Sequence, residues 1–180
     1  MPNSSDNLVI ITGGPGSGKS TLIAALAAAG YDTAPEAGRA LIQQQVRIGG
    51  DAHLDATRFA ELSLSWDMRS YDWALTRPGL VFFDRALPGI PAHYSLHGTA
   101  VPRHVEAAIA ACPYRRLVFV APAWRDIYRN DVERRQTWAE AVAVHRAVRE
   151  TYPRYGYEPM ELLCDSVAAR VEFILCNLAA

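Results

Sequence analysis

Short apolar runs alternate with longer stretches of helical periodicity along the chain. The runs that predict buried strands cover residues 8–12, 31–33, 80–83, 117–120 and 157–163. The stretches that predict helices cover residues 22–29, 36–47, 54–77, 105–111, 124–151 and 167–178, with a short helix around His93. This alternation predicts one α/β domain over residues 1–180, in which helices cover both faces of a parallel five-stranded sheet. Ligands bind at the carboxyl ends of the strands in such sheets.

A glycine-rich segment joins the first predicted strand to the first predicted helix. It reads Gly13-Gly14-Pro15-Gly16-Ser17-Gly18-Lys19-Ser20-Thr21, which matches the P-loop pattern in its strand–loop–helix context. Glycines let backbone N–H groups turn inward around a phosphate, and the N-terminus of the following helix favours the same anion. We expect Lys19 to reach the β- and γ-phosphates of ATP, Ser20 to ligate Mg²⁺, and Thr21 to meet the α-phosphate.

The composition sets the lysine of this segment apart. The chain of 180 residues has 18 lysines and arginines, and Lys19 is the only lysine. A guanidinium fork cannot imitate a compact ammonium group, so a retained lysine suits a phosphate site, although codon bias is an alternative explanation. An Asn-Lys-x-Asp motif, which recognises guanine, would need a second lysine. The absence of this motif argues against a GTPase and favours adenine as the base of the bound nucleotide.

Net charge and cysteine content exclude several other classes of protein. The net charge is −1, and 50% of the residues are hydrophobic, which is not the composition of a disordered tail or a basic nucleic-acid binder. No apolar run approaches the ~20 residues that cross a membrane. Three widely spaced cysteines form neither a disulfide framework nor a zinc pattern. We expect a cytoplasmic protein without membrane or nucleic-acid partners, and its oligomeric state stays open.

An acidic residue follows the third predicted strand. Four apolar residues and then Asp84 give the form of a Walker B strand, whose aspartate can hold Mg²⁺. Arg85 stands where water-activating ATPases of the AAA+ type carry a glutamate. The Asp-Arg pair resembles that of thymidylate-kinase-like enzymes, where it serves magnesium, phosphates and acceptor. The alternative is an aspartate that caps the strand and pairs with its neighbour.

Glu36 follows the second predicted strand, and Arg39 lies one helical turn further on the same face. In P-loop kinases this position often faces the phosphoryl acceptor, where a glutamate can accept the proton of the acceptor hydroxyl or bind its sugar. We therefore expect the acceptor to bind over about residues 36–77. The alternative is a first-turn glutamate that only favours the helix N-terminus.

The segment between the fourth and fifth predicted strands is rich in arginine. Small kinases carry a mobile lid there, here about residues 123–150, and lid arginines surround the γ-phosphate on closure. Arg125 and Arg129 share a helix face at i,i+4, and Arg134 follows them. We expect one or more of the three to reach the phosphates. A solvated helix whose arginines pair with nearby acidic residues is the alternative.

Taken together, these segments resemble the AAA-like predicted ATPases related to the ribosylnicotinamide kinase domain. The resemblance rests on Ile11–Thr21, Pro35–Arg39, Phe82–Arg85, Tyr128–Arg134 and Asp165–Leu175. It implies a three-layer P-loop NTPase fold of the kinase type, with strand order 2-3-1-4-5, ATP and Mg²⁺, and with Asp84 beside Ser20. It does not imply a particular acceptor, since no second acidic residue stands near Gly89 as in many relatives.

Two functions fit this set of residues. The first is a kinase that transfers the γ-phosphoryl group of Mg-ATP to a small-molecule hydroxyl, nucleoside-like or other, with Lys19, Arg85 and lid arginines stabilising charge and Glu36 or Asp84 orienting the hydroxyl. The alternative is an ATPase or nucleotide-dependent switch that acts on a protein partner. Arg85 in place of a glutamate argues against fast hydrolysis.

Overall fold

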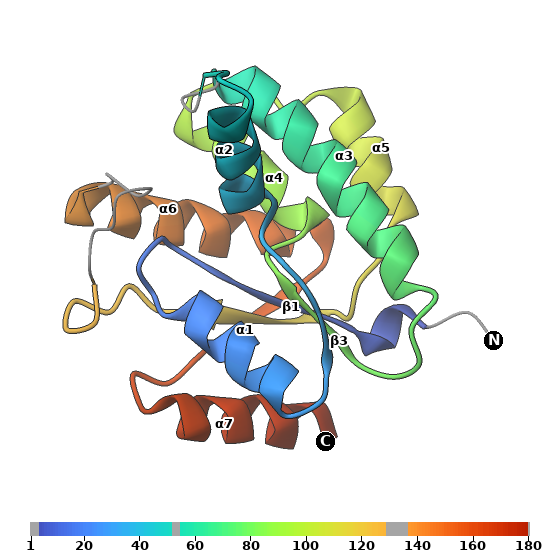
Figure 1. Ribbon diagram of the computed structural model, residues 1–180, viewed down its shortest axis with the longest axis vertical. Coiled ribbons are helices and arrows are strands. Elements are labelled where there is room, and N and C mark those ends of the chain that lie inside the picture. The colour runs from blue at the N-terminus through green and yellow to red at the C-terminus, as the bar shows by residue number, and fades with distance from the viewer. Residues whose placement is uncertain (1–3, 52–54, 129–136, 180) are drawn as a thin grey trace.

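The computed structural model describes residues 4–51, 55–128 and 137–179 and confirms the predicted parallel sheet (Figure 1). The strands are β1 (Leu8–Gly13), β2 (Asp32–Ala34), β3 (Val81–Asp84), β4 (Leu117–Ala121) and β5 (Glu158–Glu161). They form one sheet in the order β2-β3-β1-β4-β5, as the resemblance implied, and every neighbouring pair is parallel. The carboxyl ends of all these strands therefore lie at the same edge of the sheet.

Helices cover both faces of the sheet and complete three layers (Figure 1). One face carries α1 (Lys19–Ala28) and α7 (Val167–Ala179). The other carries α2 (Ala37–Arg47), α3 (Ala56–Ala74), α4 (Ile90–Leu96), α5 (Arg103–Ala111) and α6 (Trp138–Thr151). Short 3₁₀ turns are η1 (Ser5–Asn7), η2 (Leu87–Gly89) and η3 (Tyr152–Tyr155). Within the described residues, no helix combines the length and the apolar content that a membrane crossing needs.

The central strand β1 shows why its sequence is apolar from Leu8 to Ile11. Leu8 and Ile10 pack into the core beneath α3–α6, whereas Val9 and Ile11 pack into the core beneath α1 and α7. Successive side chains of a strand point to opposite faces, so a strand covered on both faces needs a continuous apolar run. The predicted strand at residues 8–12 is thus confirmed, together with its burial.

The strand register places the last residues of β1, β3 and β4 close together. Asp84 at the end of β3 is the register partner of Ile11 in β1. Ala121 at the end of β4 is the partner of Gly13, the first residue of the glycine-rich segment. The sheet itself therefore brings Asp84 and the glycine-rich segment to one edge.

The helix predicted over 124–151 is wrong in its first part, because α6 begins only at Trp138. A capping box starts the helix. The Thr137 hydroxyl accepts the backbone N–H of Glu140, and the Glu140 carboxylate accepts the backbone N–H of Thr137 at 2.6 Å. Residues 125–127 form turns instead of a helix. The predicted i,i+4 pairing of Arg125 with Arg129 therefore does not start from a helical residue, and Arg129 and Arg134 lie outside the described residues.

Candidate active site

The phosphate loop between β1 and α1 needs glycine where the backbone turns. Gly13 and Gly16 adopt φ values of 137° and 70°, in the region that side chains disfavour. A Cβ on Gly13 would lie 2.5 Å from the carbonyl oxygen of Ala121, and one on Gly16 would lie 2.6 Å from the ring of Tyr128. Glycine is therefore strongly favoured at these positions, and the curvature of the loop fits an anion nest.

Lys19 lies inside this loop and is only 3% exposed. Its Nζ donates to the carbonyl oxygen of Gly14 at 2.7 Å and to Oγ of Ser17 at 3.3 Å. Ser17 Oγ also donates to the Gly14 carbonyl at 2.8 Å. The ammonium group thus holds the loop closed, at the place where a polyphosphate can take over its hydrogen bonds.

The donor set near the loop suits Mg²⁺ held largely by phosphate and water. Ser20 is exposed in the first turn of α1, whereas Asp84 is 6% exposed at the end of β3. Both offer oxygen ligands, which hard cations prefer, and Mg²⁺ usually takes only one or two of them from protein. The described residues contain no group of three or more histidines, cysteines or carboxylates that could hold a metal ion. Thr21 is also exposed in the first turn of α1.

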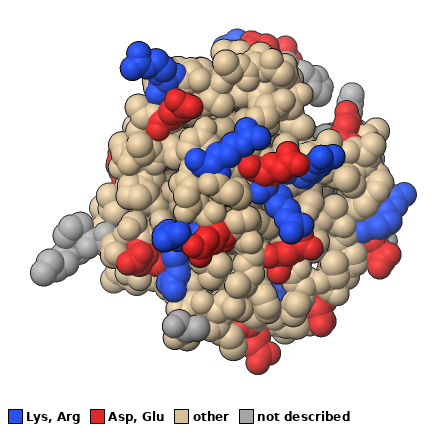
Figure 2. Space-filling model, turned by 180° about the vertical axis from the view of Figure 1, so that it is seen from behind, with Lys and Arg blue, Asp and Glu red and all other residues tan. Residues whose placement is uncertain are grey.

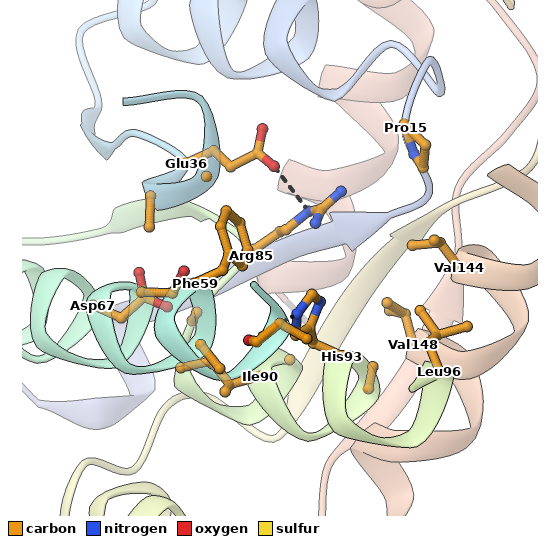
Figure 3. Close-up of a pocket in the computed structure, with 18 of the residues that line it drawn as sticks. Pro15, Glu36, Phe59, Asp67, Arg85, Ile90, His93, Leu96, Val144 and Val148 are labelled. Atoms are coloured by element: carbon orange, nitrogen blue, oxygen red, sulfur yellow. Dashed lines mark hydrogen bonds and ion pairs between the residues drawn. The ribbon is translucent and has the colours of Figure 1, made fainter. Parts of the chain in front are cut away.

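A cavity of about 380 Å³ adjoins the phosphate loop through Pro15. Its walls come from α2, α3, η2, α4 and α6. Figure 3 shows Glu36, Arg85 and Asp67 on one side and the aliphatic side chains of Val144, Val148 and Leu96 on the other. The cavity therefore offers a charged side and an apolar side to one bound molecule.

The charged side contains an ion pair between two neighbouring strand ends. Glu36, which precedes α2, places Oε1 3.4 Å from Nε of Arg85, which follows β3 (Figure 3). Burial lowers the pKa of Arg85, but the carboxylates of Glu36, Asp84 and Asp67 outweigh it and raise that pKa above its ordinary value. The guanidinium therefore stays charged within the site.

Arg85 adopts a backbone conformation that is rare for a side chain of its size. Its φ is 65°, and within the described residues it is the only residue other than glycine with a positive φ. Its N–H donates to the carbonyl oxygen of Ile11 at 2.9 Å, and one terminal nitrogen donates to the Gly13 carbonyl at 3.4 Å. Such a conformation costs about 1 kcal/mol and persists where the surroundings fix it, often at functional sites.

Asp67 is a cavity residue that the sequence interpretation missed. It lies on α3, half-buried, and lines the cavity with Phe59 and Ser63 from the same helix face. Burial, and then the charge of Glu36, raises its pKa to about 7, against the opposing effect of Arg85. The only signal in the sequence was the i,i+4 spacing of these residues, which does not show what the face contacts.

The other expected site residues are divided between the cavity and the turn after β4. Arg39 lines the cavity from α2, and Glu36 lines it from the position just before that helix. Arg125 is exposed, and its guanidinium carbon lies 5.9 Å from the ring centre of Tyr128 and 5.2 Å from that of Trp138. Because the Tyr128 ring packs on Gly16, this aromatic cluster covers the phosphate loop.

Helix α6 contacts both the phosphate loop and the cavity. A Cβ on Gly14 would lie 2.6 Å from the carbonyl oxygen of Ala141, so the helix backbone packs directly on the loop. One and two turns further on, Val144 and Val148 line the cavity. The same helix therefore borders both candidate binding sites.

Sheet order, phosphate loop and flanking cavity define a P-loop protein of the kinase-like type. The AAA domain family matches residues 8–170, and the chain belongs to this family. No curated protein sequence gives a significant match.

Solved structures that superpose on this chain include kinases. Deoxyadenosine kinase from M. mycoides with bound dATP superposes with a TM-score of 0.67 at 16% identity, over 96% of this chain and 99% of that one. NadR protein in complex with NR gives 0.73 at 18% identity, over 96% of this chain but 50% of that one. Thymidylate kinase from Ehrlichia chaffeensis gives 0.60 at 16% identity, over 96% and 98%. At these identities the likeness shows the shared fold.

Proposed function

We propose that the protein is a kinase that transfers the γ-phosphoryl group of Mg-ATP to a hydroxyl of a small molecule. The observation that carries this proposal is the cavity of about 380 Å³ that Pro15 of the phosphate loop helps to line. Small-molecule sites commonly measure about 300–1,000 Å³, whereas transfer to water needs no such space. The nucleoside and thymidylate kinases with the same fold support a nucleoside-like acceptor.

Residues 13–21 bind the polyphosphate in this proposal. Lys19 leaves the Gly14 carbonyl and reaches the β- and γ-phosphates, while Thr21 meets the α-phosphate. Ser20 and Asp84 provide oxygen ligands for Mg²⁺, which neutralises phosphate charge when bound. The burial of Lys19 and the positive φ values of the loop glycines support this assignment.

The acceptor occupies the cavity with its reacting hydroxyl near Glu36. The hydroxyl oxygen bonds to the γ-phosphorus while the bond from that phosphorus to the bridging oxygen of ADP breaks, and Glu36 accepts the hydroxyl proton. Arg85 stabilises negative charge on the transferring group. Arg39 orients the acceptor, and α2 and α3 form the wall that binds it. The shared cavity lining of these three side chains supports this arrangement.

The arginines after β4 complete the nucleotide site on closure. Arg125, Arg129 and Arg134 are the candidates that surround the γ-phosphate. Arg125 must leave the aromatic rings of Tyr128 and Trp138 to do so. In this proposal, its contacts with the two rings hold the side chain away from the phosphates until the nucleotide binds.

The surface favours a small acceptor over a nucleic acid. On the face seen in Figure 2, basic and acidic side chains are intermixed across the described residues, with no broad patch of one sign. The net charge of −1 agrees with this distribution. A phosphate backbone needs clustered positive charge for binding.

The test is acceptor-dependent turnover of Mg-ATP across a panel of nucleosides, nucleotides and sugars. We expect at least one compound to raise ADP release well above the rate without acceptor, with the phosphorylated product seen by mass spectrometry. Lys19→Met should abolish this turnover, and Arg146→Met, at an exposed arginine paired with Glu150, should leave it unchanged. Hydrolysis without acceptor that rises only with a protein partner would overturn the kinase in favour of the ATPase or switch.

A further inference from the structure

A buried arginine lies beneath the phosphate loop, on the face of the sheet opposite the cavity. Arg170 of α7 is 2% exposed, although α7 is a surface helix packed against α1 (Figure 1). Both of its terminal nitrogens donate to the backbone carbonyl oxygen of Ser17, each at 3.3 Å. The guanidinium therefore contacts the loop from behind and takes no part in the acceptor cavity.

The charge of Arg170 is not balanced by a carboxylate within the described residues. No ion pair of Arg170 with an acidic side chain occurs there, and its Nε is buried without a hydrogen-bond partner. Burial lowers the pKa of this group, and only the thiol of Cys164 opposes that effect. A buried guanidinium without an anion is unfavourable, so a stability role alone explains it poorly.

The contact with Ser17 fixes the direction of the loop backbone. In an anion nest the N–H groups point inward and the carbonyls point outward, and Arg170 donates to the outward carbonyl of Ser17. Gly18 allows this approach, since a Cβ there would lie 2.9 Å from the Arg170 guanidinium. The Ser17 hydroxyl then bonds the Gly14 carbonyl, which also accepts from Lys19. Arg170 is thus linked to the phosphate-binding lysine through one residue of the loop.

We propose that Arg170 is a positioning residue of the phosphate loop whose buried charge is compensated by the bound polyphosphate. It orients the Ser17 peptide so that the loop amides face the anion, and it adds positive charge behind them. The proposal rests on the nucleotide-binding part of the proposed function and does not depend on the acceptor. It predicts that polyphosphate binding and α7 are energetically linked.

The experiment measures the affinity of the whole chain for Mg-ATP and for inorganic tripolyphosphate by calorimetry. Arg170→Met should weaken both at least tenfold, whereas the melting temperature without ligand should stay equal or rise, because an unbalanced buried charge is removed. Arg170→Lys should bind tripolyphosphate more tightly than Arg170→Gln, since it restores charge without the fork that bonds Ser17. Arg146→Met is the matched control at an exposed helical arginine.

A merely structural role gives a different result. A lower melting temperature with unchanged affinity in Arg170→Met, or equal affinity of the Lys and Gln variants, would overturn the proposal. If Arg170→Met does not fold, the Lys and Gln pair decides alone. A chain that binds Mg-ATP in this Arg170-dependent way but phosphorylates no acceptor would leave this inference standing and remove the kinase activity.

Discussion

Glu36 Oε1 and Arg85 Nε lie 3.4 Å apart and join the chain after β2 to the chain after β3. Because β2 and β3 are neighbours in the sheet, this ion pair spans adjacent strand ends at the border between phosphate loop and cavity. In the proposed reaction, a phosphoryl group that approaches Arg85 would compete with Glu36 for the guanidinium. The Glu36 carboxylate would then be able to accept the proton of the acceptor hydroxyl, so the arrival of the phosphate would be coupled to the activation of the acceptor.

Glu36→Gln should lower kcat by about 10²-fold, because an amide cannot accept the hydroxyl proton. The KM for ATP should change little, since Glu36 lies on the acceptor side of the pair. Steady-state kinetics with the best acceptor of the panel give both numbers. Glu150→Gln, at an exposed carboxylate paired with Arg146, is the control and should behave as wild type. An unchanged kcat in Glu36→Gln would remove the assignment of this residue as base.

Lys19→Met should abolish ATP-dependent turnover and change the free energy of unfolding by only ~1 kcal/mol. The modest change follows from the loss of the hydrogen bonds to Gly14 and Ser17 against relief of a buried charge. Urea denaturation measures the stability, and calorimetry with Mg-ATP measures binding. Retained ATP affinity in the variant would contradict the assignment of the phosphate loop.

Arg85→Gly and Arg85→Ala should differ in stability, although both remove the same ion pair. The φ of 65° at this position suits glycine and strains alanine, so the glycine variant should be more stable by ~1 kcal/mol. Paired urea denaturation curves test this difference. Equal stability would mean that the backbone relaxes once the side chain is gone.

Asp67→Asn should change how stability depends on pH. The pKa of Asp67 is about 7 in the folded protein against 3.8 for the free side chain, so the folded state binds more protons between these values. The contribution of Asp67 is therefore greatest below pH 3.8 and is lost as the pH rises to about 7. At pH 8 the ionised Asp67 carboxylate destabilises the folded state, and an asparagine does not. Because water reaches this carboxyl through the cavity and screens its charge, we expect the asparagine variant to be more stable than wild type by only ~1–2 kcal/mol.

Denaturation curves from pH 4.5 to pH 8 measure this effect. Asp72→Asn, a substitution on the same helix at a residue that does not line the cavity, is the control and should follow the wild-type curve. If the difference in unfolding free energy between Asp67→Asn and wild type did not grow as the pH rises, the raised pKa would be contradicted.

The phosphate loop and the sheet could be predicted because their signals are local. The glycines of residues 13–18 are dictated by backbone conformation, and the apolar runs are dictated by cover on both faces. The start of α6 was also present in the sequence as Thr137-x-x-Glu140, a signal that the longer helical pattern obscured.

Asp67 and Arg170 could not be predicted because their roles depend on distant parts of the chain. Burial and then the charge of Glu36 raise the pKa of Asp67, and Arg85 opposes them; both charged residues belong to other elements. Arg170 contacts Ser17, which lies 153 residues earlier, and in the sequence it is one arginine among many. Local periodicity carries no information about such tertiary contacts.

The direct packing of Ala141 against Gly14 gives α6 a thermodynamic consequence. Under the proposed function, this helix would contact the nucleotide loop at one end and the acceptor through Val144 and Val148, so a shift on binding one ligand would alter the fit of the other. Linkage would then require that the acceptor changes the dissociation constant of ATP by the same factor by which ATP changes that of the acceptor. Substrate synergy in this protein would thus originate in a single helix.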